Sequence, residues 1–169
     1  STSMRMIFAL LLNFVIFNNF NEMPNKETVA KYIRGWVGAV GIMAIGNTYQ
    51  CFRDPRFFTE KIYTEISAKD YMLSARLFGI WNFLTASLRL YCAFFINNRQ
   101  VYNFTLWSFL LSLVHFLSEV LIYKSAAWSP GLVTTLLVSV ISIVVMIIGY
   151  WYIDSEEDMH RESLERKTR

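Results

Sequence analysis

Long apolar runs without a charged side chain constrain this fold more than any other feature of the sequence. The run from Gly35 to Phe52 has no charged residue, and the run from Trp128 to Ile153 is uncharged and rich in leucine, valine and isoleucine. A helix needs about 20 apolar residues to cross the hydrocarbon core of a bilayer. Runs of this length are unusual in the core of a soluble domain, so the sequence predicts a multi-pass membrane protein.

Composition and charge agree with a membrane protein and argue against several other classes. Hydrophobic residues make up 54% of the 169 residues, and the net charge is only +3. The basic residues stand mainly in linkers and tails, where they report topology, so no nucleic-acid partner is expected. The two cysteines, Cys51 and Cys92, lie in apolar segments without zinc-ligand spacing, which predicts buried thiols and no metal site.

Four helices are expected to cross the membrane and to pack as an all-α bundle. The second expected span carries Arg76 and Arg89 but is otherwise mostly apolar. A short connection, Asn97–Gln100, makes the second and third spans antiparallel neighbours. The expected spans are 35–52, 72–96, 101–122 and 128–153, with an N-terminal extension over 1–34 and a charged, solvated and partly disordered tail over 154–169.

The N-terminal extension contains a short apolar segment, Met6–Asn21, that is interrupted by asparagines. A signal-like segment is one interpretation, but no small-residue cleavage site follows it. An interfacial or re-entrant helix is the interpretation we favour. A fifth transmembrane helix is the third, and it would place the N-terminus on the opposite side of the membrane.

The distribution of lysine and arginine predicts the orientation of the four spans. The side that would hold both termini carries more basic residues than the other, which favours cytoplasmic termini. Near the C-terminus, Arg166 and Lys167 resemble a dilysine-type retrieval signal of the endoplasmic reticulum, although an ordinary solvated basic tail explains them equally well. Such a signal works only on the cytoplasmic side.

Small and polar residues recur on one face of each expected span. Lipid tails give helices no hydrophobic reason to associate, so such faces are expected at helix–helix contacts. The residues of these faces are, in chain order, Gly35, Gly38, Gly41 and Asn47; Ala75, Gly79, Asn82, Ala86, Arg89 and Ala93; Thr105, Ser108, Ser112, His115 and Glu119; and Gly131, Thr135, Val138, Ser142, Val145 and Gly149.

Charged groups at membrane depth are costly and normally have a partner. A cluster of Asn82, Arg89, His115 and Glu119 is one arrangement that these faces allow. The antiparallel hairpin, however, places Arg76 nearer to the depth of Glu119, so Arg76 is the better predicted partner. For Arg89, the alternative to the cluster is an extension toward the connection between the second and third spans.

Catalytic chemistry has little support in the sequence. His115 and Glu119 share one helical face and could in principle move a proton, but an interhelical hydrogen bond or ion pair is the favoured interpretation. The chain has 2 histidines, too few for a histidine-box iron enzyme, and it lacks nucleotide-binding and hydrolase motifs. We therefore expect no catalytic residue and no cofactor.

Several strings resemble the ergosterol biosynthetic protein 28 family over about residues 35–153. The first is Met43–Asp54, MAIGNTYQCFRD, at the end of the first expected span. The others are ARLFGIW at Ala75–Trp81, TLWSFL at Thr105–Leu110 and HFLSE at His115–Glu119, in the order and spacing of that family's central hairpin.

The resemblance implies a non-catalytic scaffold in the endoplasmic reticulum membrane. Its implied partners are the sterol C-4 methyl oxidase, the decarboxylating 3-hydroxysteroid dehydrogenase and the 3-keto sterol reductase. A sterol- or lipid-binding protein, with a pocket lined by Asn82, His115 and aromatic residues, is the alternative. A small membrane enzyme built on His115 and Glu119 is a third hypothesis, and self-association remains open.

Overall fold

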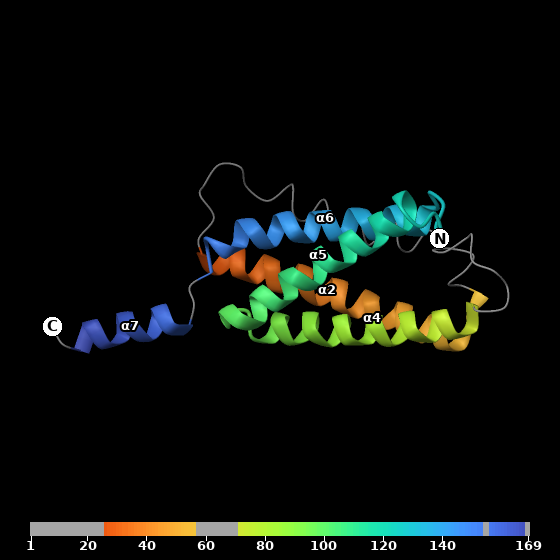
Figure 1. Cartoon of the computed structure of the whole chain (residues 1–169). Coiled ribbons are helices and arrows are strands. Elements are labelled where there is room, and N and C mark those ends of the chain that lie inside the picture. Colours follow the sequence, from red (N-terminus) through yellow and green to blue (C-terminus); the bar gives the residue numbers. More distant parts are fainter. Residues whose placement is uncertain (1–25, 57–70, 154–155, 168–169) are drawn as a thin grey trace.

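The computed structural model describes residues 26–56, 71–153 and 156–167, and every regular element in these ranges is a helix. Four long helices lie alongside one another in a bundle (Figure 1). The predicted all-α bundle is therefore confirmed. The helices are α2 (Lys26–Arg53), α4 (Tyr71–Phe94), α5 (Arg99–Leu121), α6 (Pro130–Tyr150) and α7 (Glu156–Lys167). The predicted apolar segment Met6–Asn21 lies outside the described residues.

Local capping explains where α5 and α6 begin. The Asn98 side chain accepts hydrogen bonds from the backbone N–H groups of Gln100 and Val101, which have no partner within the first turn of α5. Ser129 caps α6 in the same way, and Pro130 follows at the start of the helix, where its missing N–H costs nothing. The polar connections that predicted turns are thus also the signals that start the helices.

Three of the bundle helices are long and apolar enough to cross a membrane: Met72–Phe94, Arg99–Leu121 and Pro130–Tyr150. The first expected span forms part of α2, which begins earlier, at Lys26, and so includes charged residues before Gly35. Its second half contains Asn47, Thr48 and Gln50. These polar residues lower the hydropathy of α2, which is long enough to span but is not among the three.

Small residues allow α2 and α4 to approach closely. A Cβ atom added to Gly41 of α2 would lie 3.0 Å from Cγ of Leu90, and one added to Gly79 of α4 would lie 3.2 Å from Cβ of Cys51. The whole predicted face of α4 is buried, from Ala75 to Ala93. This agrees with the expectation that stripes of small residues mark helix contacts in lipid.

Side-chain hydrogen bonds join α6 to α2 and α5. The indole N–H of Trp36 on α2 donates to Oγ of Ser142 on α6 at 3.0 Å. The hydroxyl of Tyr102 on α5 donates to the carbonyl oxygen of Met146 at 2.7 Å. Because both bonds are buried, losing either partner would leave a polar group without compensation.

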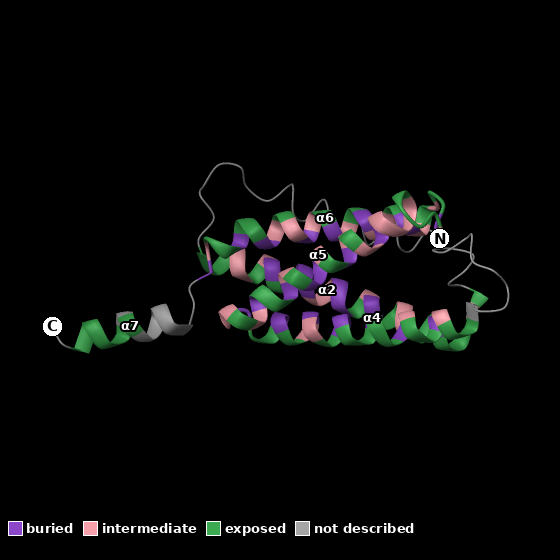
Figure 2. Cartoon of the chain, in the orientation of Figure 1, coloured by how far each residue is buried: buried purple, intermediate pink, exposed green. Residues whose placement is uncertain are grey.

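The outward faces of the bundle are apolar. Figure 2 shows the exposed residues along the outer sides of the helices and the buried residues between them. On α5, exposed Phe104, Trp107 and Leu111 recur at spacings of three and four, which places them on one face. Such a surface suits lipid or an apolar partner in the membrane.

The C-terminal tail differs from the prediction of partial disorder. It forms helix α7 over Glu156–Lys167, followed by residues outside the description. Glu, Met, Arg, Leu and Lys, which dominate this segment, are all good helix formers. The basic side chains of Arg166 and Lys167 stand in the last turn, where they interact favourably with the helix dipole.

Candidate functional site

A cavity of about 350 Å³ lies within the bundle and draws its walls from α2, α4, α5 and α6. This volume falls within the range of about 300–1,000 Å³ that is usual for small-molecule sites. Its polar wall residues include Asn47, Asn82, Thr85, Arg89, Ser112, Thr135 and Ser139. Its apolar wall residues include Val40, Met43, Phe78, Trp81, Phe109, Phe116 and Val138.

Asn82 and Arg89 line the cavity from the same face of α4, about two helical turns apart. The Asn82 side chain donates through Nδ2 to the carbonyl oxygen of Phe78 at 3.0 Å. The exposed fractions of Asn82 and Arg89 are 9% and 7%. The arginine is therefore buried in the bundle, and it does not extend to the connection between α4 and α5 as predicted.

The Arg89 guanidinium lies over an aromatic ring. Its Cζ atom is 4.2 Å from the centroid of the Phe109 ring on α5, a distance at which the cation is attracted to the ring face. Nε of Arg89 is buried without a hydrogen-bond partner within the described structure. Because α5 brings Phe109 next to Arg89, the guanidinium stacks on this ring instead of extending toward the connection between the helices. Its hydrogen bonding is incomplete.

The hydroxyl groups of the cavity wall donate to their own helices. Ser112 donates to the carbonyl oxygen of Ser108 at 2.8 Å, and Ser139 donates to that of Thr135 at 3.0 Å. Thr135 itself donates to the carbonyl oxygen of Gly131 at 3.0 Å. A hydroxyl has one hydrogen and two lone pairs, so these groups retain only acceptor capacity.

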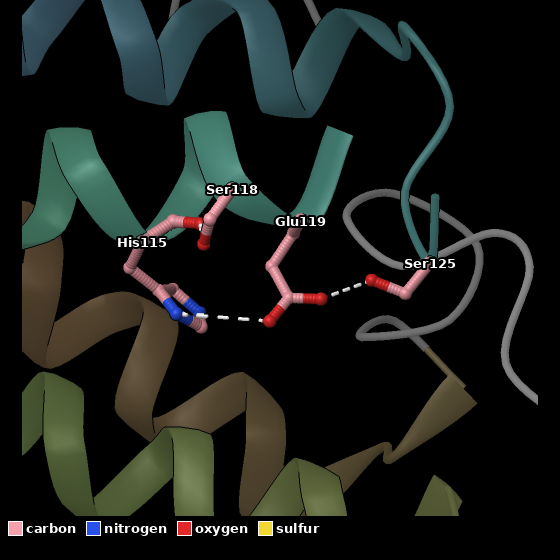
Figure 3. Close-up of polar contacts among 4 residues, drawn as sticks. All are labelled: His115, Ser118, Glu119 and Ser125. Carbon is pink, nitrogen blue, oxygen red and sulfur yellow. Dashed lines mark hydrogen bonds and ion pairs between the residues drawn. The ribbon is translucent and has the colours of Figure 1, made fainter. Parts of the chain in front are cut away.

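His115 and Glu119 form a separate polar group at the end of α5. Nδ1 of His115 lies 3.8 Å from Oε1 of Glu119, and Oε2 of Glu119 accepts a hydrogen bond from the hydroxyl of Ser125. Figure 3 shows Glu119 between the two residues, joining α5 to the segment that leads to α6. The side chains of His115 and Glu119 are 42% and 19% exposed.

The predicted pairing of Arg76 with Glu119 is not formed in the described structure. Arg76 is exposed on α4, and the carboxylate of Glu119 instead contacts His115 and Ser125. Arg76 and Glu119 stand at the same end of the hairpin, but their positions along the helices do not specify how each helix is rotated about its axis. A local contact along α5 and its following loop took the place of the interhelical pair.

The predicted cluster of four polar residues is divided by the fold. Asn82 and Arg89 line the cavity, whereas His115 and Glu119 are not among its wall residues. The cavity also includes Asn47, which the sequence placed on a packing face, and Ser139, which the sequence analysis missed. Ser139 follows Thr135 by one helical turn, a spacing from which it could have been found.

The described residues offer no assembled metal site or disulfide. No group of three or more His, Cys, Asp or Glu residues within them could hold a metal ion. Cys51 and Cys92 are free and buried, as predicted. The fold and the site together define a small helical membrane protein with a partly open cavity between its helices, walled by both apolar and polar residues.

Comparison with known proteins narrows this class to one family. The model of the family described as "Erg28 like protein" matches residues 33–144. The human "Ergosterol biosynthetic protein 28 homolog" is 44% identical over 124 residues, which cover 73% of this chain and 89% of the human protein. This chain belongs to the Erg28 family.

Fungal relatives extend the same match. "Ergosterol biosynthetic protein 28" of Schizosaccharomyces pombe is 37% identical over 66% of this chain and 80% of the relative. The protein of that name from Saccharomyces cerevisiae is 30% identical over 68% of this chain and 78% of the relative. No solved structure matches.

Proposed function

We propose that this chain is a non-catalytic scaffold of the endoplasmic reticulum membrane that acts in sterol biosynthesis. Its proposed partners are the sterol C-4 methyl oxidase, the decarboxylating 3-hydroxysteroid dehydrogenase and the 3-keto sterol reductase. Holding such enzymes together raises the effective concentration of each active site around a product that stays in the bilayer.

Family membership supports the sterol pathway, because the relatives are named for ergosterol biosynthesis and their name is not that of an enzyme. The arrangement of polar and apolar groups supports the scaffold role. Polar side chains such as Ser142 and Tyr102 contact other helices inside the bundle, whereas the outward face of α5 presents large apolar side chains, Trp107 among them. The outward apolar surface suits lipid as well as a partner, so membership of a family named for ergosterol biosynthesis is the observation that carries the proposal.

The test is functional replacement of the Saccharomyces cerevisiae relative by the full chain with an affinity tag. Membranes are solubilised in mild detergent, partners of the tagged chain are identified by mass spectrometry, and cellular sterols are profiled. We expect the three sterol enzymes to co-purify, and C-4 methylated sterols to accumulate in the deletion strain and fall when the chain is expressed. An equally tagged multi-pass protein of the same membrane, unrelated in sequence, is the control.

Two results would contradict the scaffold. One is a restored sterol profile without recovery of any of the three enzymes above the control. The other is conversion of a sterol substrate by the purified chain alone, which would make it an enzyme.

The cavity favours a second candidate, a sterol- or lipid-binding protein. The cavity combines aromatic and aliphatic walls with a few polar groups, the composition expected of a small-molecule site. Saturable binding of a sterol to the purified chain, without recovery of sterol enzymes, would favour this candidate over the scaffold.

A further inference from the structure

We propose that the cavity between α2, α4, α5 and α6 binds an amphipathic molecule whose carboxylate pairs with Arg89 and whose apolar body lies against the aromatic wall. The site itself follows from the geometry of the cavity. The choice of a particular carboxylate also depends on the proposed function.

The charge of Arg89 is the first reason. An ionised group taken out of water is costly unless it is paired and hydrogen-bonded. Arg89 lines the cavity at 7% exposure, its Nε atom lacks a hydrogen-bond partner, and no ion pair to it is formed by the described residues. The ring of Phe109 compensates part of the cost of burying this charge. A ligand anion would supply the ion pair that the described residues do not form.

The donors and acceptors of the wall specify what kind of group fits. Ser112, Thr135 and Ser139 already use their hydrogens on backbone carbonyl oxygens. Nδ2 of Asn82 also donates to a backbone carbonyl. The side-chain amides of Asn47 and Gln50 also line the cavity, but the guanidinium of Arg89 is its one charged donor among the described wall residues. A carboxylate accepts only, and its two oxygens match the planar fork of an arginine.

The rest of the wall specifies the body of the ligand. Phe78, Trp81, Phe109 and Phe116 come from α4 and α5, and Val40 and Val138 come from α2 and α6. A cavity of about 350 Å³ is at the lower end of the usual range, which suits one compact hydrophobic acid better than a phospholipid with two chains and a large headgroup.

Two sources can supply such an acid: a membrane fatty acid or a sterol that carries a carboxyl group. The sterol acid rests on the proposed function, because a decarboxylating sterol dehydrogenase must receive a carboxylate. The shared chemistry is a carboxylate on an apolar body, and the binding assay separates the two sources.

The assay measures binding of radiolabelled oleate and of a C-4-carboxylated sterol to the purified full chain in a neutral detergent. Each acid is compared with its methyl ester, which keeps the body and removes the charge. We expect saturable binding of at least one acid, at least about tenfold tighter than binding of its ester, because hydrogen bonds to charged groups are the stronger ones. Binding of oleate alone assigns a fatty acid, and binding of the sterol acid alone assigns a sterol carboxylate; either supports the site.

Variants connect the binding to the cavity. We expect Arg89→Met to weaken binding of the acid at least about tenfold and to leave binding of the ester unchanged. Replacing an unpaired buried charge by an apolar side chain does not threaten folding. Arg76→Met is the matched control, because Arg76 is an exposed arginine on the same helix and outside the cavity wall. Val138→Phe keeps Arg89 but narrows the cavity, and should weaken binding of acid and ester alike.

Equal affinity for acid and ester would overturn the proposal, and so would unchanged binding of the acid by Arg89→Met. Recovery of sterol enzymes by affinity purification is measured on the same variants. A chain that binds the acid but recovers no enzyme contradicts the scaffold and leaves the proposed site intact. A chain that recovers the enzymes but does not bind the acid contradicts the proposed site and leaves the scaffold intact.

Discussion

Trp36 on α2 and Ser142 on α6 form a buried hydrogen bond across 106 residues of sequence, with Nε1 and Oγ 3.0 Å apart. The bond joins α2, whose polar residues lower its hydropathy, to α6, the most apolar of the three candidate spans. It ties α2 to α6, in addition to the close packing of α2 against α4.

Ser142→Ala should lower the stability of the folded chain in detergent. The substitution removes the acceptor and leaves the indole N–H of Trp36 buried without a partner. Interhelical hydrogen bonds in membrane proteins contribute about 0.6 kcal/mol on average and up to about 1.7 kcal/mol, and we expect a loss in this range. Thermal unfolding followed by tryptophan fluorescence measures it.

Ser87→Ala is the control for this loss. Ser87 is exposed on α4 and donates within its own helix to the carbonyl oxygen of Phe83. An equal loss in both variants would show that the bond between α2 and α6 has no special role.

Two glycine substitutions should change stability in opposite directions. A Cβ atom at Gly149 would overlap Ile33 and lie 2.8 Å from the Tyr102 hydroxyl, so Gly149→Ala should destabilise by about 1–3 kcal/mol through overpacking. Gly35 has nothing within 4 Å of the same position, so Gly35→Ala should stabilise α2 by up to about 1 kcal/mol through helix propensity. Denaturation in mixed micelles compares the two, and a stabilising Gly149→Ala would contradict the packing of α2 against α6.

Glu119→Ala should reduce the recovery of sterol enzymes with the tagged chain before it changes the conversion of sterols in the cell. The substitution removes the carboxylate that contacts both His115 and Ser125, so the segment between α5 and α6 loses an anchor. Affinity purification followed by quantitative mass spectrometry measures the recovery, and His115→Ala should act in the same direction.

Asn103→Ala, an exposed substitution on α5, is the matched control for both variants. One result would contradict a structural role for His115 and Glu119. It is a Glu119→Ala variant that recovers all three enzymes as before but no longer supports sterol conversion in the cell.

Replacing both Arg166 and Lys167 by alanine should move the chain out of the endoplasmic reticulum. Both side chains are exposed in the last turn of α7, as binding to a retrieval receptor would require. Fluorescence microscopy of the chain tagged at its N-terminus measures the distribution. Arg161→Ala, an exposed basic residue in the same helix, is the control. If the double variant keeps its distribution, the basic tail is not a retrieval signal.

The helices and the buried face of α4 could be predicted from the sequence because both depend on local features. The predicted face of α6 was only partly right, because of its six residues only Ser142 and Gly149 are buried. Apolar runs predict α4, α5 and α6, and the capping residues Asn98 and Ser129 start two of them. The face of small residues from Ala75 to Ala93 is buried throughout, because a spacing of three and four places residues on one side of any helix. Family membership was also visible in contiguous strings of the sequence.

Only the tertiary structure decided which polar groups meet. Helical spacing says which residues share a face, but it does not say how far each helix is rotated or which neighbour it contacts. The contact of Arg89 with Phe109 depends on those rotations, and it was not predicted. That of Glu119 with Ser125 depends on the path of the loop after α5, which helical spacing does not specify either. The cavity has the same origin, because its wall combines side chains of four helices that are far apart in the sequence.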